Sequence, residues 1–243
     1  MEQSTLPKQQ WGEPLMIETD YTTGFEAARK NMVAHQIRCC KVLDADLLDM
    51  LETMPRDEFL PENIRSLAYM EGHAPLPCGQ EMLTPLQEAT FLQHLQLQGH
   101  ESVLLIGAGT GFMTMLLALR SAHVTACEYH ADLASMAKNN LSNHGITNAD
   151  VLLVNAMDAD AMQMMLKKKK FDVLVIAAAL ADIPLHLRSR VTENGQIMAF
   201  LGSNPVVTLQ HKQIQGSACI TTPLLETSLL SIEGIKKTRV LDF

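Results

Sequence analysis

The chain has 243 residues, of which 47% are hydrophobic and 19% are charged, and its formal net charge is -8 at pH 7. This length and composition predict a soluble globular protein, built as one large domain or as one domain with an extension. The negative charge argues against a general nucleic-acid-binding protein, because the phosphate backbone repels an acidic surface. The one basic run, residues 167–170, is expected to follow a helix, where cations suit the helix C-terminus.

The spacing of the cysteines and histidines indicates whether disulfides or metal sites are expected. The five cysteines form no Cys-x-x-Cys pair, which predicts free buried thiols and a reducing, cytoplasmic location rather than a disulfide framework. The nine histidines show no metal-ligand spacing, so no metal site is expected. The first 20 residues lack the apolar segment of a signal peptide, and no apolar run has the length needed to span a bilayer.

The first hundred residues are predicted to be mainly helical. Residues 1–22 are expected to form a loose tail, followed by a helical region over 23–100 that contains an irregular, proline-rich loop at 73–85. Asp44 is a good N-cap, because its carboxylate can accept hydrogen bonds from the first free amides of a helix. Helical spacing or capping residues predict helices over residues 25–39, 44–54, 61–69 and 86–97.

Strands and helices alternate over the remaining part of the chain, residues 101–243. This alternation predicts an α/β core with a doubly wound, mostly parallel sheet. Beyond Gly202 two strands follow one another without a helix, so an antiparallel hairpin is expected to complete the sheet. The predicted strands cover residues 102–106, 123–127, 150–154, 171–177, 195–201, 206–214 and 216–223, and the helices between them include 131–144 and 184–190.

A glycine-rich turn follows the first of these strands. Residues 103–106 are all apolar, as in a central parallel strand, and residues 107–111 are Gly-Ala-Gly-Thr-Gly. Glycines allow a sharp turn and a close approach of the backbone to a ligand. The Gly-x-Gly-x-Gly spacing is typical of S-adenosylmethionine-dependent methyltransferases. A dinucleotide fingerprint has its third glycine where Phe112 stands, which disfavours a dehydrogenase.

An acidic residue, Glu128, closes the next predicted strand. A carboxylate at this place accepts hydrogen bonds from the ribose hydroxyls of a nucleotide ligand in α/β folds. Taken singly, the glycine turn is also consistent with a tight strand-to-helix connection, and Glu128 with a solvated loop carboxylate. Taken together, they predict a site for a nucleoside-containing ligand.

Short segments spread along the chain carry a family resemblance. They are residues 31–38, 42–44, 55–61, 67–69, 75–77, 79–80, 145–148, 171–173, 177–179, 183–184 and 194–196. Over roughly residues 25–235 the chain resembles the protein-L-isoaspartate O-methyltransferases. The resemblance implies a Rossmann-like class I methyltransferase fold and S-adenosyl-L-methionine as cofactor. It also implies methyl transfer to the free α-carboxylate of isoaspartyl residues in damaged proteins or peptides, which repairs them.

The resemblance also implies where the cofactor binds. The residues expected to contact it are Gly107, Ala108, Gly109, Gly111, Glu128, Tyr129, Asn155, Ala156 and Ala177. Because a carboxylate nucleophile is already ionised at neutral pH, the reaction needs alignment rather than a general base.

The sequence departs from the family pattern at several positions. Leu83 stands where the family has a serine that contacts the substrate carboxylate, so the neighbouring hydroxyl of Thr84 becomes the candidate catalytic group. Glu81 replaces a threonine near the anionic substrate, and Leu105 replaces an acidic residue near the methionine end of the cofactor. Asn155 replaces an acid that helps to hold the adenine.

Three functions therefore remain open from the sequence. The first is an active isoaspartyl carboxyl methyltransferase with a shifted substrate loop. The second is a methyltransferase of the same lineage with another substrate. The third is a catalytically degenerate protein that binds S-adenosylmethionine or a partner without methyl transfer.

Overall fold

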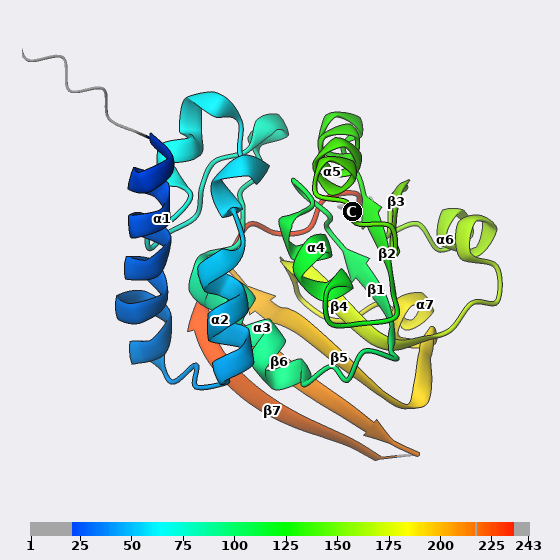
Figure 1. Ribbon diagram of the computed structural model, residues 1–243. Coiled ribbons are helices and arrows are strands. Elements are labelled where there is room, and N and C mark those ends of the chain that lie inside the picture. Colours follow the sequence, from blue (N-terminus) through cyan, green and yellow to red (C-terminus); the bar gives the residue numbers. More distant parts are fainter. Residues whose placement is uncertain (1–20, 217, 236–243) are drawn as a thin grey trace, which may run out of the picture.

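The computed structural model of the chain describes residues 21–216 and 218–235 (Figure 1). The tail expected over residues 1–22 lies outside the described residues, except for its last two residues, which begin helix α1 (Tyr21–Met32). The chain is helical over the predicted range 25–39, but only its first part is α-helical. After Met32 it continues as a π-helical turn (Val33–Ile37) and a 3-10 turn (Arg38–Cys40), which ends at Lys41 with a φ of +69°.

The other N-terminal helices begin where the sequence predicts. The side chain of Asp44 accepts a hydrogen bond from Leu47 N at 3.0 Å and caps α2 (Ala45–Thr53). The segment after Pro61 is a 3-10 helix (Glu62–Leu67) rather than an α-helix. Helix α3 (Pro85–Leu95) follows the irregular loop.

The predicted sheet is confirmed, including its antiparallel end (Figure 1). Strands β1 to β5 run parallel, and β6 and β7 form an antiparallel hairpin at one edge. The order across the sheet is β3-β2-β1-β4-β5-β6-β7. The strands are β1 (Ser102–Ile106), β2 (His123–Glu128), β3 (Ala149–Leu153), β4 (Phe171–Leu180), β5 (Val191–Ser203), β6 (Val206–Gln215) and β7 (Ala218–Thr227).

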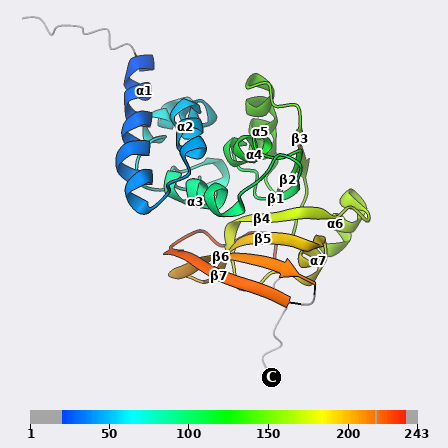
Figure 2. The ribbon, with the colours of Figure 1, turned by 60° about the horizontal axis from the view of Figure 1, so that its bottom comes forward.

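Two apolar clusters cover the two faces of the sheet. Side chains of successive strand residues point to opposite faces, so Val103 and Leu105 of β1 join one cluster, and Leu104 and Ile106 join the other. The first cluster also holds residues of α2 and α3, so the N-terminal helices share a continuous core with the sheet. Figure 2 shows α1 to α5 gathered on one side of strands β4 to β7. The helices after β1 are α4 (Phe112–Ala118), α5 (Ala131–Asn143), α6 (Ala159–Leu166) and α7 (Leu185–Arg188).

The cysteines differ from the expectation of buried thiols. Cys127 on β2 is buried, but Cys39, Cys40, Cys78 and Cys219 are exposed, because they lie in turns or in the edge hairpin, away from both apolar clusters. Burial raises the pKa of the Cys127 thiol to about 12. Among the helices of the described residues, none is both long and apolar enough to cross a membrane.

Candidate active site

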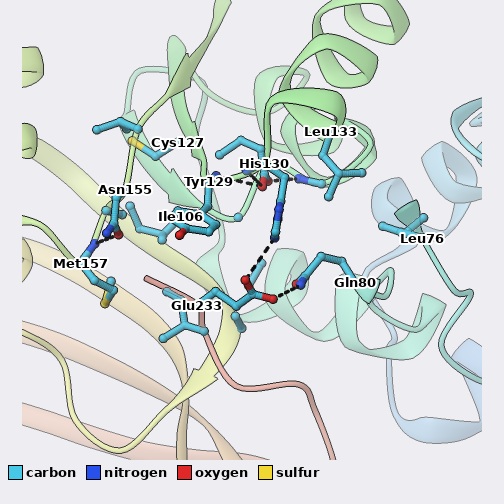
Figure 3. Close-up of a pocket in the computed structure, with 18 of the residues that line it drawn as sticks. Leu76, Gln80, Ile106, Cys127, Tyr129, His130, Leu133, Asn155, Met157 and Glu233 are labelled. Atoms are coloured by element: carbon cyan, nitrogen blue, oxygen red, sulfur yellow. Dashed lines mark hydrogen bonds and ion pairs between the residues drawn. The ribbon is translucent and has the colours of Figure 1, made fainter. Parts of the chain in front are cut away.

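A cleft opens at the carboxyl ends of the central parallel strands (Figure 3). It lies where β1 has β2 on one side and β4 on the other, which is the place where ligands bind in open α/β sheets. Its volume is about 640 Å³, including open solvent at its mouth. Residues at or just after the carboxyl ends of β1, β2 and β3 and within the last part of β4 line the cleft, and residues of the irregular loop and of the segment after β7 complete it.

The glycine-rich turn forms one wall of this cleft. Gly107 and Gly109 have φ values of +90° and +55°, which side chains rarely allow, and both line the cleft. Gly107 N donates to Cys127 O at 2.9 Å, so the turn is tied to the end of β2. Gly111, with φ +92°, has a different reason to be glycine, because a Cβ there would lie 3.1 Å from the backbone of Ala137 in α5.

Glu128 holds the turn and faces the cleft. Its carboxylate accepts hydrogen bonds from Gly109 N at 2.8 Å, Tyr129 N at 2.9 Å and His130 N at 3.0 Å. Two of these go to Oε1 and one goes to Oε2, so a lone pair on Oε2 stays available for a hydroxyl donor. The side chain is 5% exposed. No lysine or arginine is among the described residues that line the cleft, so its charge is not neutralised there.

The loop after β3 forms the opposite wall. Asn155 Oδ1 accepts from Met157 N at 2.9 Å (Figure 3). Its Nδ2 donates to Gly234 O at 3.0 Å. Both polar atoms of the Asn155 side chain, which is predicted to contact adenine, therefore already have hydrogen-bond partners within the protein. Ala156 lines the same wall, where it offers backbone groups and an apolar surface.

The structure brings most of the predicted cofactor residues together. Ala108 lines an adjoining cavity instead, and Gly111 lines neither cavity. The residues that share the cleft are Gly107, Gly109, Glu128, Tyr129, Asn155, Ala156 and Ala177. Residues that were not predicted to contact the cofactor also line the cleft, among them Leu76, Gln80, His130, Leu133, Met157, Ile232 and Glu233. Of these, Leu76 and Gln80 lie in the resemblance motifs, whereas Glu233 has no sequence signal.

The adjoining cavity lies between the glycine turn and the irregular loop, next to the cleft. Glu81, Met82 and Leu83 line it together with the buried Glu88 of α3. Leu83 is 5% exposed and belongs to the first apolar cluster, and its carbonyl accepts from Arg56 Nη2 at 2.5 Å. An apolar side chain thus occupies the place where the family resemblance predicts a donor to a carboxylate.

Thr84 has a structural partner. Its Oγ1 accepts from Gln87 N at 3.2 Å, and its backbone N donates to Gln87 Oε1 at 2.9 Å, which is a capping box at the start of α3. Among the described residues it lines neither the cleft nor the adjoining cavity. A contact between Thr84 and a substrate stays a prediction, and it requires a movement of this helix start.

A buried ion pair lies beneath the irregular loop. Arg56 and Glu88 pair directly, each with a side chain that is 2% exposed, and Arg56 Nε donates to Ala68 O at 2.7 Å. Burial raises the pKa of Glu88 to about 7, although the guanidinium of Arg56 opposes this shift. The arginine also lies over the ring of Phe112, 5.2 Å from its centroid. Because its partners are already inside the protein, Arg56 is not a free cation for an anionic substrate.

Leu105 lies outside the site. Leu105 is fully buried on the face of β1 opposite to Ile106, and it contributes to neither cavity. The residues that the structure describes contain no group of three histidine, cysteine or acidic side chains placed to hold a metal ion.

The sheet order, the glycine turn and Glu128 at the end of β2 define a Rossmann-like class I methyltransferase. Residues 27–231 match the family model of protein-L-isoaspartate(D-aspartate) O-methyltransferase. The chain belongs to this family.

Similar proteins agree with this membership. A protein-L-isoaspartate O-methyltransferase of Koribacter versatilis is 33% identical over 87% of this chain and 93% of its own length. One of Methanoculleus marisnigri is 32% identical over 72% of this chain and 77% of its own length. A crystal structure from Plasmodium falciparum, assigned as a protein-L-isoaspartate O-methyltransferase and bound to S-adenosyl-L-homocysteine, has the same fold. Its TM-score is 0.72 at 17% identity, over 84% of this chain and 98% of that one.

Proposed function

We propose that this protein is an S-adenosylmethionine-dependent carboxyl methyltransferase that acts on isoaspartyl residues of proteins or peptides. The observation that carries the proposal is the cleft at the carboxyl ends of β1, β2 and β4, with Glu128 at its edge, in a chain of the isoaspartate methyltransferase family. Three carboxylates and no lysine or arginine are among the described residues that line the cleft, which suits a cofactor whose sulfonium carries a positive charge.

Each wall of the cleft suits one part of the cofactor. Glu128 has a lone pair on Oε2 for a ribose hydroxyl. Tyr129 and Ala156 offer apolar surface and backbone groups to the adenine. Gly107 and Ala177 face one another, since a Cβ on the glycine would lie 3.6 Å from Ala177 Cβ, and both line the part of the cleft that suits the methionine part. The bound cofactor supplies an electrophilic methyl group.

The protein contributes alignment to the reaction. The nucleophile is a carboxylate that is ionised at neutral pH, so no side chain has to remove a proton. The adjoining cavity shares Leu76, Glu81 and Ala177 with the cleft, which makes it the place from which a substrate approaches. Fixed geometry of the substrate carboxylate beside the cofactor supplies a large part of a rate enhancement.

A second candidate function is a methyltransferase of the same lineage with another substrate. Leu83 is buried at the edge of the adjoining cavity, Glu81 and Glu88 also line that cavity, and Arg56 is already paired. The carboxylate of Glu81 disfavours an anionic substrate, and the apolar Leu83 offers it no donor, so the cavity suits a neutral or cationic substrate. The same features fit a noncatalytic cofactor-binding protein.

One set of assays separates these functions. Calorimetric titration with S-adenosylhomocysteine measures cofactor binding, and transfer of a labelled methyl group to an isoaspartyl peptide measures activity, with the matched aspartyl peptide as control. Binding with transfer to the isoaspartyl peptide alone supports the proposal. Binding without transfer leaves the second candidate or the noncatalytic protein, and a protein that does not bind the cofactor contradicts the proposal.

We also propose that the protein acts in the cytoplasm and on protein rather than nucleic acid. The five cysteines are all free, which fits a reducing compartment. The net charge of -8 disfavours a phosphate backbone as partner. Fractionation of cells that express the protein tests the first statement, and a nucleic-acid mobility-shift assay tests the second.

A further inference from the structure

The segment after β7 returns across the cofactor cleft. Residues 228–234, called the roof segment below, leave the edge of the sheet and cross the carboxyl ends of the parallel strands towards α5 (Figure 1). Ala179 N at the end of β4 donates to Leu230 O at 3.0 Å, and Ile232 N donates to Ala179 O at 2.8 Å. Ser231 thereby pairs with Ala179 in parallel register. An isolated parallel β-bridge thus fixes the roof segment to the end of β4 beside the cleft.

The C-terminal end of the roof segment, at Gly234, packs closely against Asn155 in the loop after β3. Gly234 O accepts the hydrogen bond from Asn155 Nδ2, and Gly234 has φ +82°. A Cβ at this position would lie 2.3 Å from Asn155 Oδ1, so a larger residue cannot make the same contact. The roof segment therefore reaches the wall of the cleft where adenine is expected.

Glu233 spans the space between two parts of the site (Figure 3). Its Oε1 accepts from Gln80 Nε2 at 2.6 Å, and its Oε2 lies 3.5 Å from His130 Nε2. Gln80 belongs to the irregular loop, and His130 follows Glu128 at the start of α5. A second tie runs beside this one, because Leu230 N donates to Glu81 Oε1 at 3.0 Å. One carboxylate thus joins the irregular loop to the cofactor edge.

We propose that the roof segment closes over the bound cofactor and that Glu233 is a positioning residue, which holds the irregular loop in place for the substrate. The inference rests on the cofactor part of the proposed function. The family match ends at residue 231, so Glu233 and Gly234 lie outside it. A ligand that binds beneath the closed roof stabilises the closed form, and opening of the ties then controls its release.

Hydrogen exchange measured by mass spectrometry tests the closure directly on the intact chain. The amides of Leu230 and Ile232 are bonded only when the roof is closed. Saturating S-adenosylhomocysteine is expected to slow exchange about tenfold or more in peptides that cover residues 228–235 and 73–84. Peptides of the β6–β7 hairpin serve as the internal control, and their exchange is expected to stay unchanged.

Variants of Glu233 test its positioning role. Glu233→Ala is expected to raise the Kd for S-adenosylhomocysteine about five- to tenfold and to abolish the protection of residues 73–84. Glu233→Gln keeps an acceptor for Gln80 and is expected to restore that protection. Glu226→Ala is the matched control, because Glu226 is an exposed carboxylate on β7 that lines neither cavity.

Gly234→Ala tests the fit of the roof to Asn155. It is expected to raise the Kd about tenfold, whereas Gly145→Ala is expected to leave the Kd unchanged. Gly145 has a similar φ of +67° but open space around its Cβ position.

A parent protein that does not bind S-adenosylhomocysteine overturns both this inference and the proposed function. If the parent binds but exchange in 228–235 does not change, or if Glu233→Ala binds as tightly as Glu226→Ala, the inference alone is wrong.

Discussion

Replacement of Glu128 by alanine tests whether this residue binds the cofactor or only stabilises the fold. The carboxylate accepts three backbone hydrogen bonds, from Gly109, Tyr129 and His130. Removing it leaves these amides without their acceptor, which we expect to lower the free energy of unfolding by about 2–4 kcal/mol. It also removes a charged acceptor for a ribose hydroxyl, worth about 2 kcal/mol, or roughly a 30-fold increase in the Kd for S-adenosylhomocysteine.

Glu101→Ala is the matched control for this experiment. Glu101 is also buried, and it accepts hydrogen bonds from Gln98 N at 2.9 Å and Gly99 N at 3.1 Å. It lies just before β1, at the end of the sheet opposite the cleft. We expect a similar loss of stability in urea unfolding but an unchanged Kd by calorimetry well below the unfolding temperature. A Kd for Glu128→Ala within twofold of the parent, or an equal rise in Glu101→Ala, would refute the assignment of Glu128 to the ribose.

Three further predictions concern stability and the substrate loop. Gly111→Ala combines a positive φ with a Cβ that would lie 3.1 Å from Ala137, so urea unfolding should show a loss of about 2–3 kcal/mol. Leu83→Ser should raise methyl transfer to an isoaspartyl peptide by roughly 30- to 1000-fold if the new hydroxyl reaches the substrate carboxylate, while burial lost from the core costs about 2–4 kcal/mol of stability. The folded-state pKa of Glu88 is about 7, above its reference value of 4.5. The folded state therefore binds more protons between these values, and the unfolding free energy should fall as the pH rises through about 7, by up to about 3 kcal/mol relative to Glu88→Gln.

Each of these three predictions has its own control and its own result that would contradict it. Gly145→Ala, with open space around its Cβ, should cost only about 1 kcal/mol, and an equal cost at both glycines would contradict the steric argument at Gly111. The control for Leu83→Ser is Leu95→Ser. Leu95 is buried in α3 and lines neither cavity, so this variant should lower the free energy of unfolding without raising the rate of methyl transfer. A parent that is fully active on the isoaspartyl peptide would make the Leu83 prediction wrong and would favour Thr84. Parallel pH profiles for the parent and Glu88→Gln would show that Glu88 does not titrate near 7.

Local patterns in the sequence determined the sheet and one half of the site. The parallel strands and the final hairpin follow from runs of apolar residues with helices or turns between them, and these signals depend on neighbours in the chain. The glycine turn after β1 and Glu128 after β2 come together because carboxyl ends of adjacent parallel strands meet at one edge. Asp44 caps α2 for an equally local reason, since its side chain bonds an amide three residues away.

Only the tertiary structure decided the roles of residues whose partners are distant in the sequence. Thr84 caps a helix, and Leu83 packs beside Arg56, whose charge is paired with Glu88. Gly111 is glycine because α5 passes close to it. Glu233 reaches Gln80 from more than 150 positions away in the chain, because β6 and β7 return the chain to the edge where the cleft lies. Such contacts leave no periodic signal, since each depends on how separate elements pack, and the packing is set by the whole core.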